Sequence, residues 1–312
     1  MLLSICIPTY NRSEYLKKNL DLLNHYIHQD NFSNQIDIVV SNNNSSDNTE
    51  EMILEFKKYH PKLQLYYYFQ RENIGLEKNA LFVLKEATGE FVMYLGDDDY
   101  LDNDYLKGVI EHLKNSKNTH SIIPNFISID IFSKQIGKGR DDEFPNRVYE
   151  AGFKNCRMNS WRGHQLSGLV LKREGLYDAY IDLRISNIYL FIFLVGYRCL
   201  NGDTYHCTAF PVKVTQPGQA NKDWGYGKDG LLNEVFDNYI KLPVNYFQKT
   251  LLQLFFYKKQ SWRLFMYEIK GFKSLFEAFL NILCSSNSTL LFKILFPILI
   301  FLQYINRIVK KI

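Results

Sequence analysis

Short apolar runs alternate with helical patterns along residues 1–120. Runs rich in Ile, Val, Leu and Phe predict four strands, over 3–7, 36–40, 63–69 and 91–95. Apolar residues three or four positions apart predict helices between them, over 13–26, 49–59 and 75–88. Strands that alternate with helices of this length are typical of βαβ units, so we predict an α/β fold with a mostly parallel, Rossmann-like sheet flanked by helices.

A polar loop follows each predicted strand, over residues 9–12, 41–48, 70–75 and 97–99. In a parallel sheet these loops meet at one edge, where open α/β proteins bind ligands. The last loop holds Asp97, Asp98 and Asp99, directly after an apolar strand. Carboxylate oxygens are ligands that Mg²⁺ and Mn²⁺ prefer, and a diphosphate can complete the coordination. An acidic turn before a helix is the alternative interpretation.

The rest of the chain divides into an irregular part and a helical part. Within the irregular part we predict strands over 121–130 and 168–172. We also predict a mobile loop over 216–230 that can close over a site and contains Trp224. From residue 231 onward the pattern is helical, aromatic and basic, and we treat residues 231–312 as a separate tail.

The tail carries most of the positive charge. Residues 241–312 contain nine Lys and two Arg against two Glu, a surplus of nine positive charges, whereas the whole chain carries only +4. Basic residues beside aromatic ones are typical of helices at a membrane interface, so an anionic membrane surface is the expected partner. The stretch 289–305 approaches the length of a membrane span, but it contains Lys293 and Pro297. We therefore favour a peripheral tail.

Other partners and compartments are less compatible with the sequence. The basic stretch is apolar and carries no recognised nucleic-acid motif, so we expect no nucleic acid as a partner. The five cysteines are scattered and form no CxxC pair, which argues against a disulfide framework or a zinc site. The apolar run 2–7 is too short for a signal peptide. We therefore expect the protein at the cytoplasmic face of the inner or plasma membrane.

The four loops resemble the motifs of family 2 glycosyltransferases with the GT-A fold. Residues 8–12 (PTYNR) resemble the opening motif, 41–49 (SNNNSSDNT) the second, 72–76 (ENIGL) with Asn79 the third, and 96–99 (GDDD) the DxD-like motif. Four motifs in the right order make the resemblance specific. It is strong over 1–110 and faint over 150–225. Within the family the chain is most similar to O-antigen sugar transferases, including abequosyltransferases.

The resemblance implies a GT-A catalytic domain over 1–230, with nucleotide-sugar binding in 1–110 and acceptor binding in 111–230. Within the donor site, Asp97 is expected on the ribose. Asp98 is expected to hold Mn²⁺ or Mg²⁺ on the diphosphate, with Asp99 as a supporting ligand. The positions implied in nucleotide-sugar binding are Pro8, Tyr10, Arg12, Asn43, Lys78 and Asp97.

Two positions in the second loop depart from the family pattern. Asn42 and Asn43 stand where the family usually has acids. A carboxylate can only accept hydrogen bonds, which suits the N3–H of uracil, whereas an amide can also donate, which suits the bare N3 of cytosine. We therefore expect a preference for CDP-sugars.

The acceptor side shows a third departure. Inverting members of the family usually carry an acid at the start of a helix, and Asn187 occupies the matching position here. Asp182 is the nearest alternative base, with Asp178 behind it. A retaining reaction is the other alternative. We expect His164 and Gln165 to contact the acceptor together with Asn187, although a structural role for His164 is also open.

The resemblance implies a metal-dependent transferase of sugar from a nucleoside-diphosphate sugar. Its implied acceptor is a glycan linked to undecaprenyl diphosphate, in the synthesis of O-antigen or another surface polysaccharide. One alternative is a sugar-phosphate nucleotidyltransferase, although a glycine-rich, lysine-containing loop does not follow the first strand. A non-catalytic binding or partner protein is the other. Asn187 favours this second alternative, and the Asp97–Asp98–Asp99 triplet argues against it.

Overall fold

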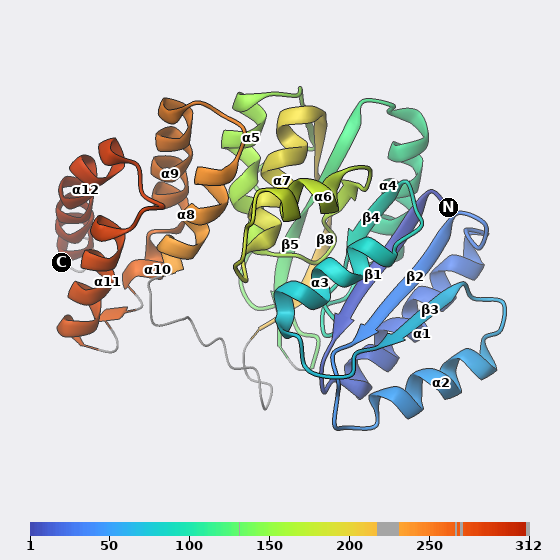
Figure 1. Cartoon of the computed structure of the whole chain (residues 1–312). Coiled ribbons are helices and arrows are strands. Elements are labelled where there is room, and N and C mark those ends of the chain that lie inside the picture. The colour runs from blue at the N-terminus through green and yellow to red at the C-terminus, as the bar shows by residue number, and fades with distance from the viewer. Residues whose placement is uncertain (131, 217–230, 266, 269–270, 310–312) are drawn as a thin grey trace.

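The fold is seen in a computed structural model that describes residues 1–312 except 131, 217–230, 266, 269–270 and 310–312. A sheet of eight described strands lies at the centre, with helices on both faces, and further helices extend from one side (Figure 1). The strand order is β3-β2-β1-β4-β7-β5-β8-β6. Strands β3, β2, β1 and β4 are mutually parallel, β7 runs antiparallel to β4 and β5, and β6 runs antiparallel to β8.

The strands follow the predicted order along the chain. Their bounds are β1 Leu3–Thr9, β2 Ile36–Asn42, β3 Leu65–Phe69, β4 Phe91–Tyr94, β5 Thr119–Ile129, β6 Arg147–Tyr149, β7 Val170–Lys172 and β8 Asp203–Thr215. The prediction of an α/β fold with a mostly parallel sheet is confirmed. The sequence did not predict β8, which pairs with β5 through an irregularity between Pro124 and Phe126. Pro211 lies inside β8 at this irregularity, and a proline disfavours a central strand in a pattern-based prediction.

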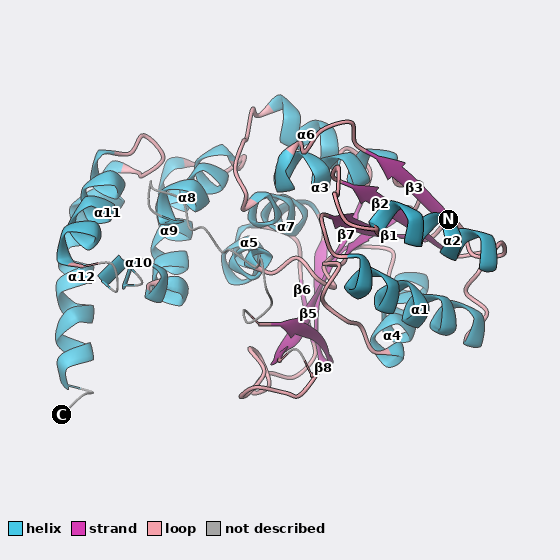
Figure 2. Ribbon diagram, turned by 90° about the horizontal axis from the view of Figure 1, so that it is seen from below, coloured by secondary structure: helices cyan, strands magenta, loops and turns pink. Residues whose placement is uncertain are grey.

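The helices of the sheet domain form two layers. Their bounds are α1 Ser13–Gln29, α2 Thr49–Tyr59, α3 Gly75–Glu86, α4 Asn103–Asn115, α5 Phe153–Asn159, the 3-10 helix η1 Ser160–His164, α6 Leu176–Asp182 and α7 Leu190–Asn201. One buried cluster joins α1, α2 and α4 to alternate residues of the strands, such as Ile5 and Met93. A second cluster joins α3, α6 and α7 to the intervening residues, such as Cys6 and Tyr94. Figure 2 shows the two layers on opposite sides of the strands.

The C-terminal part is helical, as predicted. Its helices are α8 Leu231–Lys241, α9 Tyr246–Gln260, α10 Trp262–Phe265, α11 Phe272–Cys284 and α12 Leu290–Val309. Phe236 of α8 and Phe256 of α9 belong to the same buried cluster as α7, so the first of these helices continue the core of the sheet domain. The predicted mobile loop over 216–230, with Trp224, lies almost wholly outside the described residues.

The last helix is apolar and mostly exposed. Its segment Leu290–Arg307 is long and apolar enough to cross a membrane, and 11% of it is buried. Phe292 and Phe296 are buried against α8, α9 and α11, whereas Ile294, Ile298 and Phe301 face outward. Helix α12 therefore presents one face to the core and one to the surroundings.

Candidate active site

The carboxyl ends of β1, β2 and β4 bring the first, second and fourth loops together. Thr9 pairs in register with Asn42, so the first two loops begin side by side. The Thr9 hydroxyl donates to Asp97 Oδ2 at 2.8 Å, which joins the first loop to the aspartate triplet. Asn19 of α1 donates through Nδ2 to the carbonyls of Gly96, Asp97 and Asp99, at 3.2, 2.9 and 2.8 Å. Asn19 therefore fixes the backbone of the triplet, a role that no sequence motif indicated.

Asp98 is paired with a cation from the first loop. Arg12 Nη1 lies 2.7 Å from Asp98 Oδ2, and the two side chains are 18% and 9% exposed. Arg12 is expected in nucleotide-sugar binding, and the structure pairs its guanidinium with a carboxylate of the triplet. Arg12 thus places a guanidinium directly beside the three carboxylates of the triplet.

The three carboxylates have different surroundings. Burial, followed by the charge of Asp98, raises the pKa of Asp97. Asp99 accepts hydrogen bonds from Gln165 and Ser167, which precede β7, and from the backbone N–H of Thr215 at the end of β8. Asp99 thereby ties the triplet to the acceptor side of the sheet. Its expected role as a supporting metal ligand stays a prediction.

Asn43 connects the second loop to the third. Its side-chain carbonyl accepts from the backbone N–H of Ile74 at 2.8 Å, and its Nδ2 donates to Asn73 Oδ1 at 2.9 Å. These two bonds fix the orientation of the amide and leave one N–H of Nδ2 beyond the bond to Asn73. The structure thus shows Asn43 as a donor and an acceptor at once, which an aspartate in its place would not be.

The remaining donor-site positions lie at the same edge with different exposure. Pro8 is buried near the end of β1, whereas Tyr10 is 45% exposed in the loop that follows. Lys78 is exposed in the first turn of α3, which follows the third loop. No hydrogen bond in the described chain tests the roles expected for these three side chains, and the roles stay predictions.

Of His164 and Gln165, both expected to contact the acceptor, Gln165 contacts the aspartate triplet directly. Gln165 Nε2 donates to Asp99 Oδ2 at 3.0 Å. His164 stacks on the Trp161 ring with centroids 5.6 Å apart, and its Nδ1–H donates to the Trp161 carbonyl at 2.9 Å. Burial and the charges of Arg140 and Arg263 lower the pKa of His164 to about 3. His164 is therefore neutral at physiological pH.

Asn187 lies buried between α3, α7 and α8. Its backbone N–H donates to Glu77 Oε1 at 3.0 Å, and its Nδ2 donates to Asp237 Oδ2 at 3.2 Å and to Asn238 Oδ1 at 3.3 Å. Two carboxylates that the sequence did not single out thus surround this position, one from α3 and one from α8. Asn238 returns a bond from its own Nδ2 to Asn187 Oδ1.

Asp182, the expected alternative base, is the last residue of α6 and is exposed. Within the described chain, its carboxylate makes no hydrogen bond to another residue of the candidate site. The structure thus brings Arg12, Asp97, Asp98, Asp99 and Gln165 together through direct contacts, while Asp182 stands apart. Its catalytic role stays a prediction.

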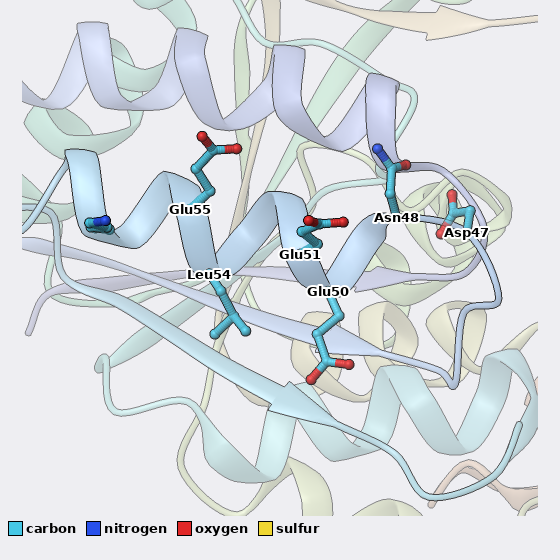
Figure 3. Close-up of a pocket in the computed structure, with 7 residues that line it drawn as sticks. Asp47, Asn48, Glu50, Glu51, Leu54 and Glu55 are labelled. Atoms are coloured by element: carbon cyan, nitrogen blue, oxygen red, sulfur yellow. The ribbon is translucent and has the colours of Figure 1, made fainter.

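A separate hollow lies on the outer side of α2 (Figure 3). Its lining residues are Asp47, Asn48, Glu50, Glu51, Leu54, Glu55 and Lys58. None of these seven is among the residues expected at the donor or acceptor site. Asp47 has a structural role, because it accepts from the backbone N–H groups of Ser13 and Thr49, both at 3.1 Å.

The fold and the placement of the loops define a glycosyltransferase of the GT-A type. Residues 4–176, more than half of the chain, match the model of glycosyl transferase family 2, and the chain belongs to that family. It is therefore a glycosyltransferase.

Individual relatives match the N-terminal third. Abequosyltransferase RfbV of Salmonella typhimurium is 40% identical over 106 residues, which cover 34% of this chain and 31% of RfbV. A GalNAc(5)-diNAcBac-PP-undecaprenol β-1,3-glucosyltransferase of Campylobacter jejuni is 32% identical over 116 residues, 37% of this chain and 34% of its own. The matched segments thus span about a third of each relative's length.

Solved structures match over most of the chain. Residues 1–349 of Staphylococcus aureus TarS, in complex with UDP-GlcNAc, give a TM-score of 0.70 at 17% identity, covering 91% of this chain and 80% of the other. The mannosyltransferase PcManGT of Pyrobaculum calidifontis, with GDP-Man and Mn²⁺, gives 0.57 at 15% identity, covering 89% and 74%. At these identities the matches show the fold. The TarS match also extends beyond residue 230, so it includes part of the C-terminal helices.

Proposed function

We propose that this glycosyltransferase uses a divalent metal ion to transfer a sugar from a nucleoside-diphosphate sugar to a lipid-linked glycan acceptor. The observation that carries the proposal is the aspartate triplet at the carboxyl edge of the sheet, where Asp97 and Asp98 are buried beside one guanidinium. A nucleoside diphosphate with its metal ion suits this edge of the sheet, because the metal would offset the charge of both the triplet and the diphosphate.

The residues present fit a divalent cation. Asp98, supported by Asp99, offers hard oxygen ligands, and the raised pKa of the adjacent Asp97 reflects burial and a neighbouring negative charge that a cation would relieve. Within the described part of the chain, no group of three or more His, Cys, Asp or Glu side chains is arranged so that it could hold a metal ion by itself. The diphosphate of the donor would therefore supply the other ligands. A bound Mn²⁺ or Mg²⁺ stabilises the departing nucleoside diphosphate as a Lewis acid.

The protein's own residues orient the donor. Thr9 and Asn19 hold Asp97 and the triplet backbone, so that Asp97 can accept a hydrogen bond from a ribose hydroxyl. Asn43, fixed by Ile74 and Asn73, presents its remaining N–H to the base. That donor suits the unprotonated N3 of cytosine, and we propose CDP-sugars as the preferred donors.

A nucleotide-sugar panel tests class, base and metal together. The full-length protein is incubated with CDP-, UDP-, GDP- and dTDP-sugars with Mn²⁺ or with EDTA, and thermal stabilisation and donor hydrolysis are measured. We expect stabilisation that requires Mn²⁺ and is strongest for a CDP-sugar. Competition in which UDP binds much more tightly than CDP would refute the base preference. Turnover of a nucleoside triphosphate with a sugar phosphate would favour a nucleotidyltransferase instead.

The acceptor and the location complete the proposal. The Campylobacter jejuni relative is named for an undecaprenol-linked glycan, and an acceptor of that kind sits in an anionic membrane. The outward face of α12 and the basic C-terminal helices suit the same surface. We therefore propose that the enzyme works peripherally at the cytoplasmic face of the membrane, on a polyprenyl-diphosphate-linked acceptor.

A further inference from the structure

Three cationic side chains lie near the Trp161 ring, where the sheet domain meets the C-terminal helices. The guanidinium carbons of Arg162 and Arg140 lie 4.9 and 5.7 Å from the centroid of its ring, and Lys259 Nζ lies 5.5 Å from it. Lys259 belongs to α9, whereas Trp161 and Arg162 belong to η1. Helix α9 therefore brings a cation from the C-terminal region to the acceptor side of the sheet domain.

The two arginines share one carboxylate. Asp141 Oδ1 lies 2.9 Å from Arg162 Nη2, and Asp141 Oδ2 lies 2.7 Å from Arg140 Nε. Both arginine side chains and Asp141 are at least nine-tenths buried. One carboxylate therefore serves two guanidinium groups, and the cluster has a surplus of positive charge before Lys259 is counted.

Lys259 has no acidic partner in the described part of the chain. Its side chain is exposed, and its contacts there are with the rings of Trp161 and of Phe255, the latter at 5.9 Å. An ammonium held over an aromatic face keeps its hydrogen-bond donors for another group. Lys259 is thus an available donor at a place where positive charge already exceeds negative charge.

The cluster is continuous with the candidate active site. His164 stacks on Trp161 with the ring planes 7° apart, and the next residue, Gln165, donates to Asp99. The neutral state of His164 agrees with a positive electrostatic environment, because after burial the charges of Arg140 and Arg263 lower its pKa further. The cationic cluster around Trp161 is therefore linked to the triplet through His164 and Gln165, on the side expected to bind the acceptor.

We propose that Lys259, positioned on Trp161, binds the diphosphate of a polyprenyl-linked acceptor. The proposal rests on the proposed function and deepens it, since it names the part of the acceptor that the C-terminal helices contact. A diphosphate suits the place because it presents several anionic oxygens to an ammonium. In this arrangement α9 completes the acceptor site, in addition to any role of the C-terminal helices at the membrane.

The test measures binding of farnesyl diphosphate to the full-length protein in EDTA, so that no metal links the probe to Asp98. The variants are Lys259→Gln and Lys259→Arg, with Lys258→Gln as the matched control, because Lys258 is the adjacent exposed lysine of α9. We expect Lys259→Gln to weaken binding on the order of tenfold, as for loss of a charged hydrogen bond. We expect Lys259→Arg and Lys258→Gln to bind within about twofold of wild type, below the effect of one such bond.

Two further probes and one control decide the source of the anion. Farnesol should bind weakly to every variant, and inorganic diphosphate should bind more weakly than farnesyl diphosphate. An equal loss of farnesyl diphosphate affinity in Lys258→Gln and Lys259→Gln would overturn the proposal. Tight binding of inorganic diphosphate by itself would also overturn it, because the site would then bind free phosphate groups. Nucleotide binding with Mn²⁺ is measured in parallel. If it fails in wild type, the proposed function fails, whereas failure only of the Lys259 effect removes this inference.

Discussion

Arg12 Nη1 lies 2.7 Å from Asp98 Oδ2, and this ion pair joins the loop after the first strand to the loop after the fourth. The two residues are 86 positions apart, and they meet because β1 and β4 are adjacent and parallel. Within the described chain, Arg12 pairs with Asp98, so a metal ion bound at Asp98 with a donor would share this carboxylate with Arg12. The acidic triplet and the first loop therefore act as one site.

Asp98→Ala should nearly abolish turnover. Its loss removes a proposed ligand for the metal and leaves the diphosphate charge poorly compensated. Steady-state kinetics with a donor identified in the panel would measure the effect. Asp104→Ala, which removes an exposed acid from the first turn of α4, serves as the control. Retention of more than about a tenth of the activity, a loss of only about 1.4 kcal/mol, would contradict the role assigned to Asp98.

Asp182→Asn should lower kcat about 100-fold or more if Asp182 is the general base, with the KM of the donor little changed. The comparison variant is Asp237→Asn, because Asp237 contacts Asn187 at the position where the family usually has its acid. Measuring kcat for both variants separates the two carboxylates. If Asp182→Asn is fully active and Asp237→Asn is not, the base belongs to α8 instead of α6.

The outward face of α12 should bind membranes. Replacing Ile294, Ile298 and Phe301 by Ser removes side chains that are 60%, 56% and 64% exposed, and should release the full-length protein from anionic vesicles without unfolding it. High salt should weaken the wild-type association, because screening reduces its electrostatic part. Vesicle co-sedimentation measures both effects.

A control and an extraction test separate the alternatives for α12. Phe292→Ser changes a fully buried side chain and should lower the free energy of unfolding by about 3 kcal/mol or more. If the triple Ser variant loses as much unfolding free energy as Phe292→Ser, the outward face belongs to the core. If carbonate cannot extract the wild-type protein from membranes, α12 spans the bilayer and the peripheral interpretation is wrong.

Asp141→Ala should destabilise the protein by about 3–5 kcal/mol, because it leaves Arg140 and Arg162 buried without their carboxylate. Asp142→Ala is the neighbouring control. Asp142 is exposed, and its loss should cost about 1 kcal/mol through its bonds to Asn125 and Gly139. Chemical denaturation of both variants measures the difference, and equal effects would show that Asp141 has no special role.

The same residue predicts a pH dependence. Burial raises the pKa of Asp141, but hydrogen bonds from His206 and Arg162 and the charge of Arg140 outweigh burial and hold the pKa below its usual range. The stabilisation is therefore present at neutral pH and is lost as the pH falls below about 4, where the unfolded carboxyl binds its proton. Denaturation midpoints of wild type and Asp141→Ala should converge at low pH.

The sequence by itself determined the α/β class, the first four strands along the chain and the positions of the polar loops. These follow from local periodicity, since a strand buried on both faces is apolar throughout and a polar loop must follow it. The sequence also indicated the family, because its motifs lie in short contiguous segments. The helical character of residues 231–312 was equally visible.

Only the tertiary structure decided which side chains meet. The pairing of Arg12 with Asp98, the bonds of Asn19 to the triplet backbone, and the approach of Lys259 to Trp161 each join residues far apart in sequence. Their contacts depend on strand order and helix packing, which local patterns do not encode. The same reason explains the C-terminal helices. Their composition indicated a membrane surface, but only packing showed that Phe236 and Phe256 belong to the core while Phe301 faces outward.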